Sequence, residues 1–410
     1  MKLADLCIRI TDGKHGDCEE QFDSGFFFIS AKDVRDGKIV YDDSRQITKR
    51  DFEDTHRRTQ LEPDDIVITN SGTIGRIALV RNNPRTFNTT FQKSVAILKP
   101  HRLSTYPQFL YYLLIGEMER LKEYAGGTAQ KNLLLRDLRD FELQIPSFET
   151  QLIIANRLVA YDDLIENNTR RIAILEEMAR RIFEEWFVHF RAPGCEGLPM
   201  VDSAIGPIPE GWQVKRLDAI IDFDPSVRVR EGVNPFVPMT SLSTTSMIVG
   251  EIELREARNG SKFSQGDTLL ARITPCLENG KTGFVDFLKD GHTGVGSTEF
   301  IVMRGRTVPA TFVQLLARSE PLRAHAIKSM SGATGRQRVR RESLEQFEIA
   351  APPPSALRRF DTAVSPMFVL ARILADQNAN LRAQRDLLLP KLISGEIDVS
   401  AASLRQEAAE

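Results

Sequence analysis

The stretch GGTAQKNLLLRDLRDFELQIP, residues 126–146, returns later in the chain as GATGRQRVRRESLEQFEIAAP, residues 332–352. A glycine, a threonine, a Phe-Glu pair and the closing proline recur at one constant offset of 206 positions (332 − 126 = 206). This period is much longer than that of a solenoid repeat, so it predicts two copies of a whole domain. Two similar but unequal modules suit a protein that binds two similar but unequal targets.

Shorter matches extend the repeat over most of each copy. Phe28-Ile29-Ser30 corresponds to Phe236-Val237-Pro238, and the segment 64–68 corresponds to 266–270. In the first copy, short β-branched or aromatic runs bounded by Gly, Asp or Asn predict strands. These expected strands cover residues 26–29, 66–69, 77–80 and 94–98, and a helix is expected over 106–121 with Pro107 in its first turn.

Each copy is followed by a long stretch with the periodicity of a helix. Apolar residues recur at alternating spacings of four and three, which is the heptad pattern of a coiled coil. Two such helices on one chain most simply pack antiparallel, and about 40 residues at 1.5 Å each span about 60 Å. The first seam is Ile154, Leu158, Tyr161, Ile165, Asn168, Ile172, Leu175, Ala179, Ile182 and Trp186. The second seam is Phe360, Val364, Met367, Ala371, Leu374, Asn378, Leu381, Arg385, Leu388 and Leu392.

Polar residues and prolines interrupt these seams. Asn168 and Asn378 each place an amide in an apolar seam, which costs stability but can fix the register of the helices. The alternative is that each is a tolerated polar residue at a frayed seam. Pro366 predicts that the second helix is kinked there or begins late, and Pro390 is expected to end it.

The fold class expected from these patterns is mixed α/β, with two similar globular domains joined by two long antiparallel coiled-coil helices. The expected organisation is a first domain at 1–148, a central spacer helix at 149–192, a second domain at 193–354, a C-terminal spacer helix at 355–395 and a disordered tail at 396–410.

Composition restricts the class of protein. The hydrophobic fraction of 41% and the charged fraction of 27% are those of an ordinary globular protein. No apolar run approaches the roughly 18 residues that span a bilayer. The four cysteines show no metal-ligand spacing, so a reducing cytoplasm is the simplest expectation. A net charge of −2 argues against non-specific coating of nucleic acid, and any DNA contact must come from local patches.

Three enzyme motifs are suggested and then fail. Gly280-Lys281-Thr282 has the end of a phosphate-binding loop, but Pro275 stands where the motif needs its first glycine. Asn234-Pro235-Phe236 is one residue short of the amino-methyltransferase motif. Pro63-Asp64 could open a nuclease carboxylate cluster, but no Asp/Glu-x-Lys triplet follows it. No supported catalytic constellation or metal site is found, so a non-catalytic binding chain is expected.

Taken in order, these motifs resemble the specificity subunit of a type I restriction-modification enzyme. The resemblance covers nearly the whole chain, and the order and duplication of its motifs are more specific than any one of them. The first recognition domain is matched by DGKH at 12–15, FISAKDV at 28–34, NSGTIG at 70–75 and GTAQKNL at 127–133. The remaining matches are WFVHFR at 186–191, GPIPEGW at 206–212 and LLLPKLISG at 387–395.

The resemblance implies a division of labour within a larger complex. Each globular domain would read one half of a bipartite, asymmetric DNA site. The helices would set the spacing and dock two modification (methyltransferase) subunits, beside motor-nuclease restriction subunits. S-adenosylmethionine, ATP and Mg would bind those partners, and this chain would bind no cofactor. Because Gln130-Lys131 is replaced by Arg336-Gln337 in the second copy, the two domains should read different half-sites.

Polar side chains on loops are the candidates for contacts with DNA, because base edges need hydrogen-bond donors and acceptors and phosphates need cations. In the first copy the candidates are Lys14, His15, Lys32, Asn70, Ser71, Thr73, Arg76, Asn88, Thr89, Gln92, Lys93, Gln130 and Lys131. In the second copy they are Arg228, Arg230, Thr240, Arg272, Thr274, Lys281, Ser297, Thr298, Arg336, Gln337, Arg338 and Arg340. For any single candidate, a solvated surface role is the simpler alternative.

Two rival functions stay open at this level. One is a coiled-coil scaffold whose globular domains bind protein, which the near-neutral charge favours. The other is a nuclease or methyltransferase in its own right, which the incomplete motifs disfavour.

Overall fold

The structure is a computed structural model that describes residues 1–125, 132–256, 259–289, 291–333, 335–397 and 399. Its chain forms two compact units. Unit 1 comprises Met1–Leu164 and Leu381–Glu410, and unit 2 comprises Ile165–Asn380. The part of the expected tail at 400–410, and residue 398 before it, lie outside the described residues.

Unit 1 contains a four-stranded antiparallel sheet in the order β1-β9-β6-β7. A second sheet has the order β5-β2-β8, in which β2 and β8 are parallel. The strands are β1 (Cys7–Asp12), β2 (Phe27–Ile29), β3 (Val34–Arg35), β4 (Lys38–Ile39), β5 (Arg45–Gln46), β6 (Ile66–Thr69), β7 (Ile77–Leu79), β8 (Thr89–Phe91) and β9 (Val95–Pro100). The helices are α1 (Leu3–Leu6), η1 (Ala31–Asp33), α2 (Lys49–Thr59), η2 (Thr86–Asn88), α3 (Pro107–Gly116), α4 (Met118–Glu123) and α5 (Leu135–Asp140).

Unit 2 repeats this plan. Its four-stranded antiparallel sheet has the order β13-β20-β17-β18, and a second sheet has the order β15-β14-β19-β16 with β14 and β19 parallel. The strands are β10 (Met200–Val201), β11 (Ile208–Pro209), β12 (Gln213–Arg216), β13 (Ile221–Phe223), β14 (Asn234–Val237), β15 (Glu253–Arg255), β16 (Ser261–Ser264), β17 (Thr268–Ala271), β18 (Thr282–Phe284), β19 (Thr293–Gly296), β20 (Phe300–Gly305) and β21 (Glu348–Ala351). The short helices are η3 (Glu184–Val188), η4 (Leu217–Ala219), η5 (Met239–Ser241), α7 (Ala310–Arg318), α8 (Glu320–Lys328) and α9 (Arg341–Glu345).

The central strand of each main sheet is buried on both faces, which explains its uninterrupted apolar sequence. In β6, Ile66 and Ile68 face the core that contains α3, whereas Val67 faces the smaller core beside β2. In β17, Leu270 faces the core that contains α7, whereas Leu269 faces the smaller core beside β14. Successive side chains of a strand point to opposite faces, so such a strand joins the two layers of its unit.

A buried carboxylate stands just before β6 and another just before β17, and each forms an ion pair. Asp65 accepts from the Lys99 ammonium at 2.7 Å, and Asp267 accepts from the Arg304 guanidinium at 2.7 Å. The same carboxylates accept the backbone N–H of Glu62 and of Ser264, respectively. A buried carboxylate needs such donors to offset the loss of hydration. The two units therefore stabilise the carboxylate before β6 or β17 in the same way, with one cation and one backbone N–H.

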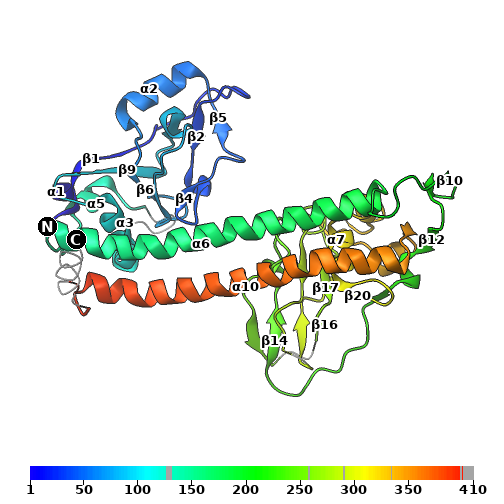
Figure 1. Ribbon diagram of the computed structural model, residues 1–410. Coiled ribbons are helices and arrows are strands. Elements are labelled where there is room, and N and C mark those ends of the chain that lie inside the picture. The colour runs from blue at the N-terminus through cyan, green and yellow to red at the C-terminus, as the bar shows by residue number, and fades with distance from the viewer. Residues whose placement is uncertain (126–131, 257–258, 290, 334, 398, 400–410) are drawn as a thin grey trace. The chain divides into compact units, whose positions relative to one another are not determined.

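Two long helices accompany the sheets, α6 (Phe148–Phe183) and α10 (Pro354–Ile393). Within unit 1 their local segments pack antiparallel, because Asp162 pairs with Arg385 and Leu158 shares a core with Leu388 (Figure 1). Within unit 2 the same direction follows from two contacts. Asn378 donates to the Ile165 carbonyl at 3.2 Å, and the rings of Phe183 and Phe360 lie 6.2 Å apart.

Three helix predictions need correction, the first of them in part. Helix α10 does not begin late at Pro366 and does not end at Pro390, since its helical residues run from Pro354 to Ile393. The other alternative, a kink at Pro366, stays a prediction. A helical proline forfeits one backbone hydrogen bond, and the buried Val364 and Phe368 on either side of Pro366 supply compensating packing. The helix expected over 106–121 is instead two helices, α3 and α4, interrupted after Gly116.

The predicted strands at 26–29, 66–69, 77–80 and 94–98 are confirmed to within two residues at each end. Among the described residues, no helix combines the length and the apolar character needed to cross a membrane.

Candidate nucleic-acid interface

In unit 1, candidate side chains gather where β6 ends. The Asn70 N–H donates to the Ser94 carbonyl at 3.0 Å, and the Asn70 carbonyl accepts the Leu133 N–H at 2.8 Å. A bridge between Ser71 and Asn132 continues this pairing. Three segments that lie far apart in sequence therefore meet at one end of the sheet.

The segment around Lys14 joins the same place through β8. The Lys14 N–H donates to the Phe91 carbonyl at 2.8 Å, and the Lys93 N–H donates to the Lys14 carbonyl at 3.0 Å. Gly13 permits this approach, because a Cβ atom there would lie 1.9 Å from the Phe91 carbonyl oxygen. The Gln92 N–H donates to the Ile29 carbonyl at 2.9 Å, which ties the segment to β2.

Unit 2 builds the same frame with the same backbone hydrogen bonds. The Arg272 N–H donates to the Glu299 carbonyl at 2.9 Å, and the Arg272 carbonyl accepts the Val339 N–H at 2.9 Å. A bridge between Ile273 and Arg338 continues the pairing, and the Ser297 N–H donates to the Val237 carbonyl at 3.1 Å.

The shared frame defines which positions are equivalent. Asn70 corresponds to Arg272, Gln92 to Ser297, Ser94 to Glu299 and Asn132 to Arg338. The unit 1 cluster is Asn70, Ser71, Gln92, Ser94 and Asn132. The unit 2 cluster is Arg272, Thr274, Ser297, Glu299, Gln337 and Arg338; Gln337 belongs to it because its carbonyl accepts the Thr274 N–H at 3.0 Å.

The two clusters differ in charge. The unit 1 cluster consists of neutral amides and hydroxyls, whereas the unit 2 cluster contains a bidentate ion pair. Arg338 donates to Glu299 through Nε at 2.8 Å and through Nη2 at 2.7 Å. The guanidinium holds the pKa of the Glu299 carboxyl below its usual value, and the carboxylate raises the pKa of Arg338. Both groups are therefore charged at neutral pH.

Unmet hydrogen-bonding capacity is present in both clusters. Asn70 Oδ1 and Ser94 Oγ in unit 1 are buried and have no hydrogen-bond partner among the described residues. Arg272 Nε and Thr274 Oγ1 in unit 2 are in the same state. Buried polar groups are normally satisfied, so unpaired atoms at both sites, including those of the equivalent residues Asn70 and Arg272, are consistent with places that receive a polar ligand.

Several predicted cations are already engaged with the protein. Arg76 Nη1 donates to the Ala31 carbonyl at 3.2 Å, and its counterpart Lys281 donates to the Met239 carbonyl at 3.2 Å. Lys14 forms an ion pair with Asp51 at 3.0 Å. These side chains brace the loops of the clusters, and a DNA contact through Lys14 would have to compete with a carboxylate.

The other candidates occupy three kinds of position. Exposed positions beside the clusters are held by His15, Lys32, Thr73, Lys93, Thr240, Thr298, Arg336 and Arg340. Four candidates lie near the ends of β8 and β19 that point away from the clusters, so the structure does not bring them together with the clusters. They are Asn88, Thr89, Arg228 and Arg230. Thr89 is also fully buried and bonded to the Arg85 carbonyl. The candidates Gln130 and Lys131 lie outside the described residues.

Sequence reasoning missed Ser94, Asn132 and Glu299. Asn132 could have been found, because the 206-residue offset places it opposite Arg338, which was a candidate. Glu299 was passed over because the search was for cations and amides, and a carboxylate that orients an arginine is visible only when both are placed in three dimensions.

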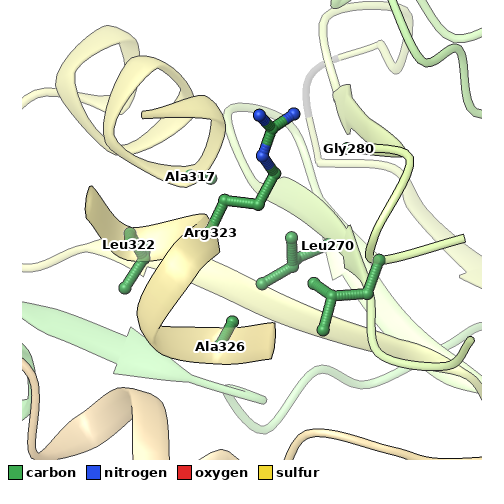
Figure 2. Close-up of a pocket in the computed structure, with 7 residues that line it drawn as sticks. Leu270, Gly280, Ala317, Leu322, Arg323 and Ala326 are labelled. Atoms are coloured by element: carbon green, nitrogen blue, oxygen red, sulfur yellow. The ribbon is translucent and has the colours of Figure 1, made fainter. Parts of the chain in front are cut away.

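A small cavity lies behind the hairpin that follows β17 (Figure 2). Its lining includes Leu270, Leu322 and Ala326, with Arg323 at its edge near Gly280. The volume of about 10 Å³ equals roughly one water molecule. This cavity is therefore too small and too apolar for a nucleotide. Within the described parts of the chain, no group of three or more His, Cys, Asp or Glu side chains could hold a metal ion.

Comparison with known proteins relates the chain to one family. Residues 1–177 match the type I restriction modification DNA specificity domain. The specificity subunit of the type I restriction enzyme MjaIX from Methanocaldococcus jannaschii is 27% identical over 394 residues, which cover 91% of this chain and 87% of that protein. The chain is similar to type I restriction enzyme specificity subunits over most of its length.

Other specificity subunits align over shorter regions. The EcoEI specificity subunit of Escherichia coli is 31% identical over 190 residues, which cover 44% of this chain and 32% of that protein. The crystal structure of a type I restriction-modification S subunit from M. genitalium has the same fold, with a TM-score of 0.57 and 14% identity, and the match covers 96% of this chain and 95% of that one. A role in DNA recognition fits this family, and a protein scaffold without DNA binding is not favoured.

Proposed function

We propose that this chain is the non-catalytic, sequence-reading subunit of a type I restriction-modification complex, in which each unit reads one half of a bipartite, asymmetric site. The observation that carries the proposal is the pair of equivalent clusters, which share one backbone frame and present different side chains. Amides such as Asn132 suit adenine, and arginines such as Arg338 suit guanine. Different side chains on one frame are what two different half-sites require.

The long helices have two roles in this proposal. They set the length of the gap between the halves as an antiparallel coiled coil, and they dock two modification subunits. The register role of Asn378 is supported by its two hydrogen bonds, to Ile165 and to Thr169 Oγ1. Asn168 is buried as well and is proposed to serve the same purpose.

Docking of the modification subunits is supported by exposed apolar residues on the helices. On α10, Val369 is 58% exposed and Ile373 is 47% exposed, and on α6 Ile174 and Met178 are exposed. Single apolar residues on a surface are ordinary, but these gather along helices that carry a buried seam on another face, as a docking surface would. S-adenosylmethionine, ATP and Mg are assigned to the modification subunits and to the motor-nuclease restriction subunits. The proposed location is the prokaryotic cytoplasm.

The proposed domain limits remain those expected from the sequence: recognition domains at 1–148 and 193–354, spacer helices at 149–192 and 355–395, and a tail at 396–410. Helices α6 and α10 support this division, since they begin at Phe148 and Pro354.

The test is selection of bound sequences from a random pool of double-stranded DNA, with the modification subunits added. A split sequence with a fixed gap supports the proposal. Binding should also weaken steeply as salt rises, because contact with phosphates releases counterions. No enrichment of any sequence contradicts it and favours the protein scaffold.

Docking is tested by co-purification of the modification subunits with Val369→Glu and Ile373→Glu. Leu254→Glu is the matched control, because Leu254 is an exposed apolar residue of unit 2 on β15. The proposal predicts loss of co-purification for the two helix variants and full retention for the control.

A further inference from the structure

The Arg338–Glu299 pair has a geometry that leaves one edge of the guanidinium free. Glu299 accepts from Nε and Nη2, which is the side edge of the planar group. The terminal nitrogens Nη1 and Nη2 each retain a hydrogen that points away from this carboxylate. Within the described parts of the chain, the guanidinium makes one further hydrogen bond, a long one of 3.5 Å from Nη1 to the Arg336 carbonyl.

This end edge is accessible and its direction is fixed. The Arg338 side chain is 43% exposed, so a ligand can approach it. Its backbone is held as well, since the Arg338 N–H donates to the Ser331 carbonyl at 2.9 Å and the Arg338 carbonyl accepts the Ser331 N–H at 3.0 Å. A planar fork whose position is fixed by a carboxylate and by its own bridged backbone loses little freedom when it binds.

The charge of the pair favours a base edge over a phosphate. Arg338 and Glu299 are together neutral, so the pair gains less from a polyanion than a free arginine would. A ligand edge with two uncharged acceptor atoms can still accept both hydrogen bonds from Nη1 and Nη2 of Arg338. Among the base pairs, guanine presents two acceptors, O6 and N7, on its major-groove edge, and a bidentate arginine is the commonest way to read them.

We infer that Arg338 reads a guanine in the half-site of unit 2 through its free end edge, and that Glu299 is the positioning residue that aims it. The inference rests on the proposed function and extends it, since it names the base and the residues. In unit 1 the equivalent positions hold Asn132 and Ser94, which cannot form this pair, so the equivalent position of the other half-site is not read by an arginine.

The experiment compares five forms of the full-length chain, each with the modification subunits, in selection from a random double-stranded pool. They are the wild type, Arg338→Lys, Arg338→Ala, Glu299→Gln and the control Arg306→Ala. Arg306 also pairs with a carboxylate, that of Asp222, and is half exposed, but it follows the far end of β20. Arg338→Lys keeps the positive charge and loses the planar fork.

The inference predicts one guanine position that responds to both cluster variants. Arg338→Lys should lower the preference for guanine there by roughly 10- to 100-fold, the range expected for one bidentate contact. Glu299→Gln should lower the preference at the same position by a smaller factor. All other positions, and every position in the control, should keep the wild-type preference.

Other outcomes overturn the inference in distinguishable ways. Weaker binding of all sequences by Arg338→Ala, with retention by Arg338→Lys, would make Arg338 a phosphate anchor. Unchanged base preferences in both cluster variants would leave the pair a structural ion pair only. If the wild type itself selects no split sequence, the proposed function fails and the inference with it.

Discussion

The two clusters are built on one backbone frame, and they differ in the side chains that the frame presents. In unit 1, Asn132 and Ser94 stand where unit 2 has Arg338 and Glu299, although the hydrogen bonds around Asn70 and Arg272 are the same. Backbone hydrogen bonds fix the position of the Cα atom and do not depend on which side chain it carries. The difference teaches that recognition can change at these positions while the fold is retained.

A second difference lies where the sheet of each unit meets a long helix. In unit 1 Arg81 pairs with Asp163 on α6 at 3.7 Å, and both side chains are exposed. In unit 2 the equivalent residue is Asp286, which faces Arg372 on α10 at 3.5 Å and is largely buried. The sign of the charge is inverted and its exposure is changed, so these two equivalent positions should respond differently to pH.

The largest expected effect tests the shared part of the two units. Asp65→Ala and Asp267→Ala each remove one partner of a buried ion pair, and each should lower the free energy of unfolding of its own unit by about 3 kcal/mol. Hydrogen-exchange protection of β6 and of β17 reports on the two units separately. Glu345→Ala, which breaks a surface pair, is the control and should cost less than about 1 kcal/mol. A small effect in one unit and a large effect in the other would break the equivalence.

The next effect concerns pH and the buried carboxyl of Asp286 in unit 2. Burial raises the pKa of Asp286 to about 6 from the ordinary value of 3.8. The folded state then holds a proton that the unfolded state releases, so this group's contribution to stability declines as the pH rises from about 4 to about 6. Asp286→Asn should remove this loss and be more stable than the wild type at pH 8, by at most about 3 kcal/mol.

The measurement is the urea unfolding of wild type and Asp286→Asn at pH 4 and at pH 8. Groups common to both proteins cancel in the difference. A difference that is the same at the two pH values would contradict the role given to Asp286. Arg372 keeps Asp376 as a partner in the variant, so the substitution leaves no unpaired cation.

A smaller effect concerns the polar contacts between the helices. Unit 1 uses a charged contact, in which Arg385 and the Tyr112 hydroxyl both donate to Asp162. Unit 2 uses Asn378, whose Oδ1 has no partner among the described residues. Asn378→Leu should therefore be neutral or stabilising by about 1 kcal/mol in thermal unfolding, because the Thr169 hydroxyl and the Ile165 carbonyl keep the hydrogen bond between them when the amide is removed. Destabilisation by more than this would show that the amide contributes stability as well as register.

The smallest effect concerns exposed cations beside the unit 2 cluster. Arg336→Ala and Arg340→Ala should each weaken DNA binding about equally for all sequences and reduce the slope of log affinity against log salt by about 1. Fluorescence anisotropy over a salt series measures this. A change confined to one sequence would place these residues among the base readers and would enlarge the unit 2 cluster.

Much of the fold could be predicted because it follows from local patterns. The repeat located both copies, and the apolar run of β6 gave its limits correctly because a strand buried on both faces has no polar interruption. The path of α10 through Pro366 could not be predicted, since the packing of Val364 and Phe368 is a tertiary effect.

The clusters were predicted in part. Asn70, Gln92, Arg272 and Ser297 were recognised as polar loop residues, but a sequence shows neither that Thr89 is buried nor that Lys14 is paired with Asp51. Glu299 could not be recognised, because its role exists only through contact with Arg338, which is 39 positions away in the chain.

The most direct test of the central claim exchanges side chains between equivalent positions. The double variant Ser94→Glu/Asn132→Arg places the unit 2 pair on the unit 1 frame, and its selected DNA sequence is compared with that of the wild type. The account predicts that one position in the half-site of unit 1 changes to guanine, while the gap and the half-site of unit 2 remain as in the wild type. A change in the half-site of unit 2, or a well-folded variant whose selected sequence is unaltered, would contradict it.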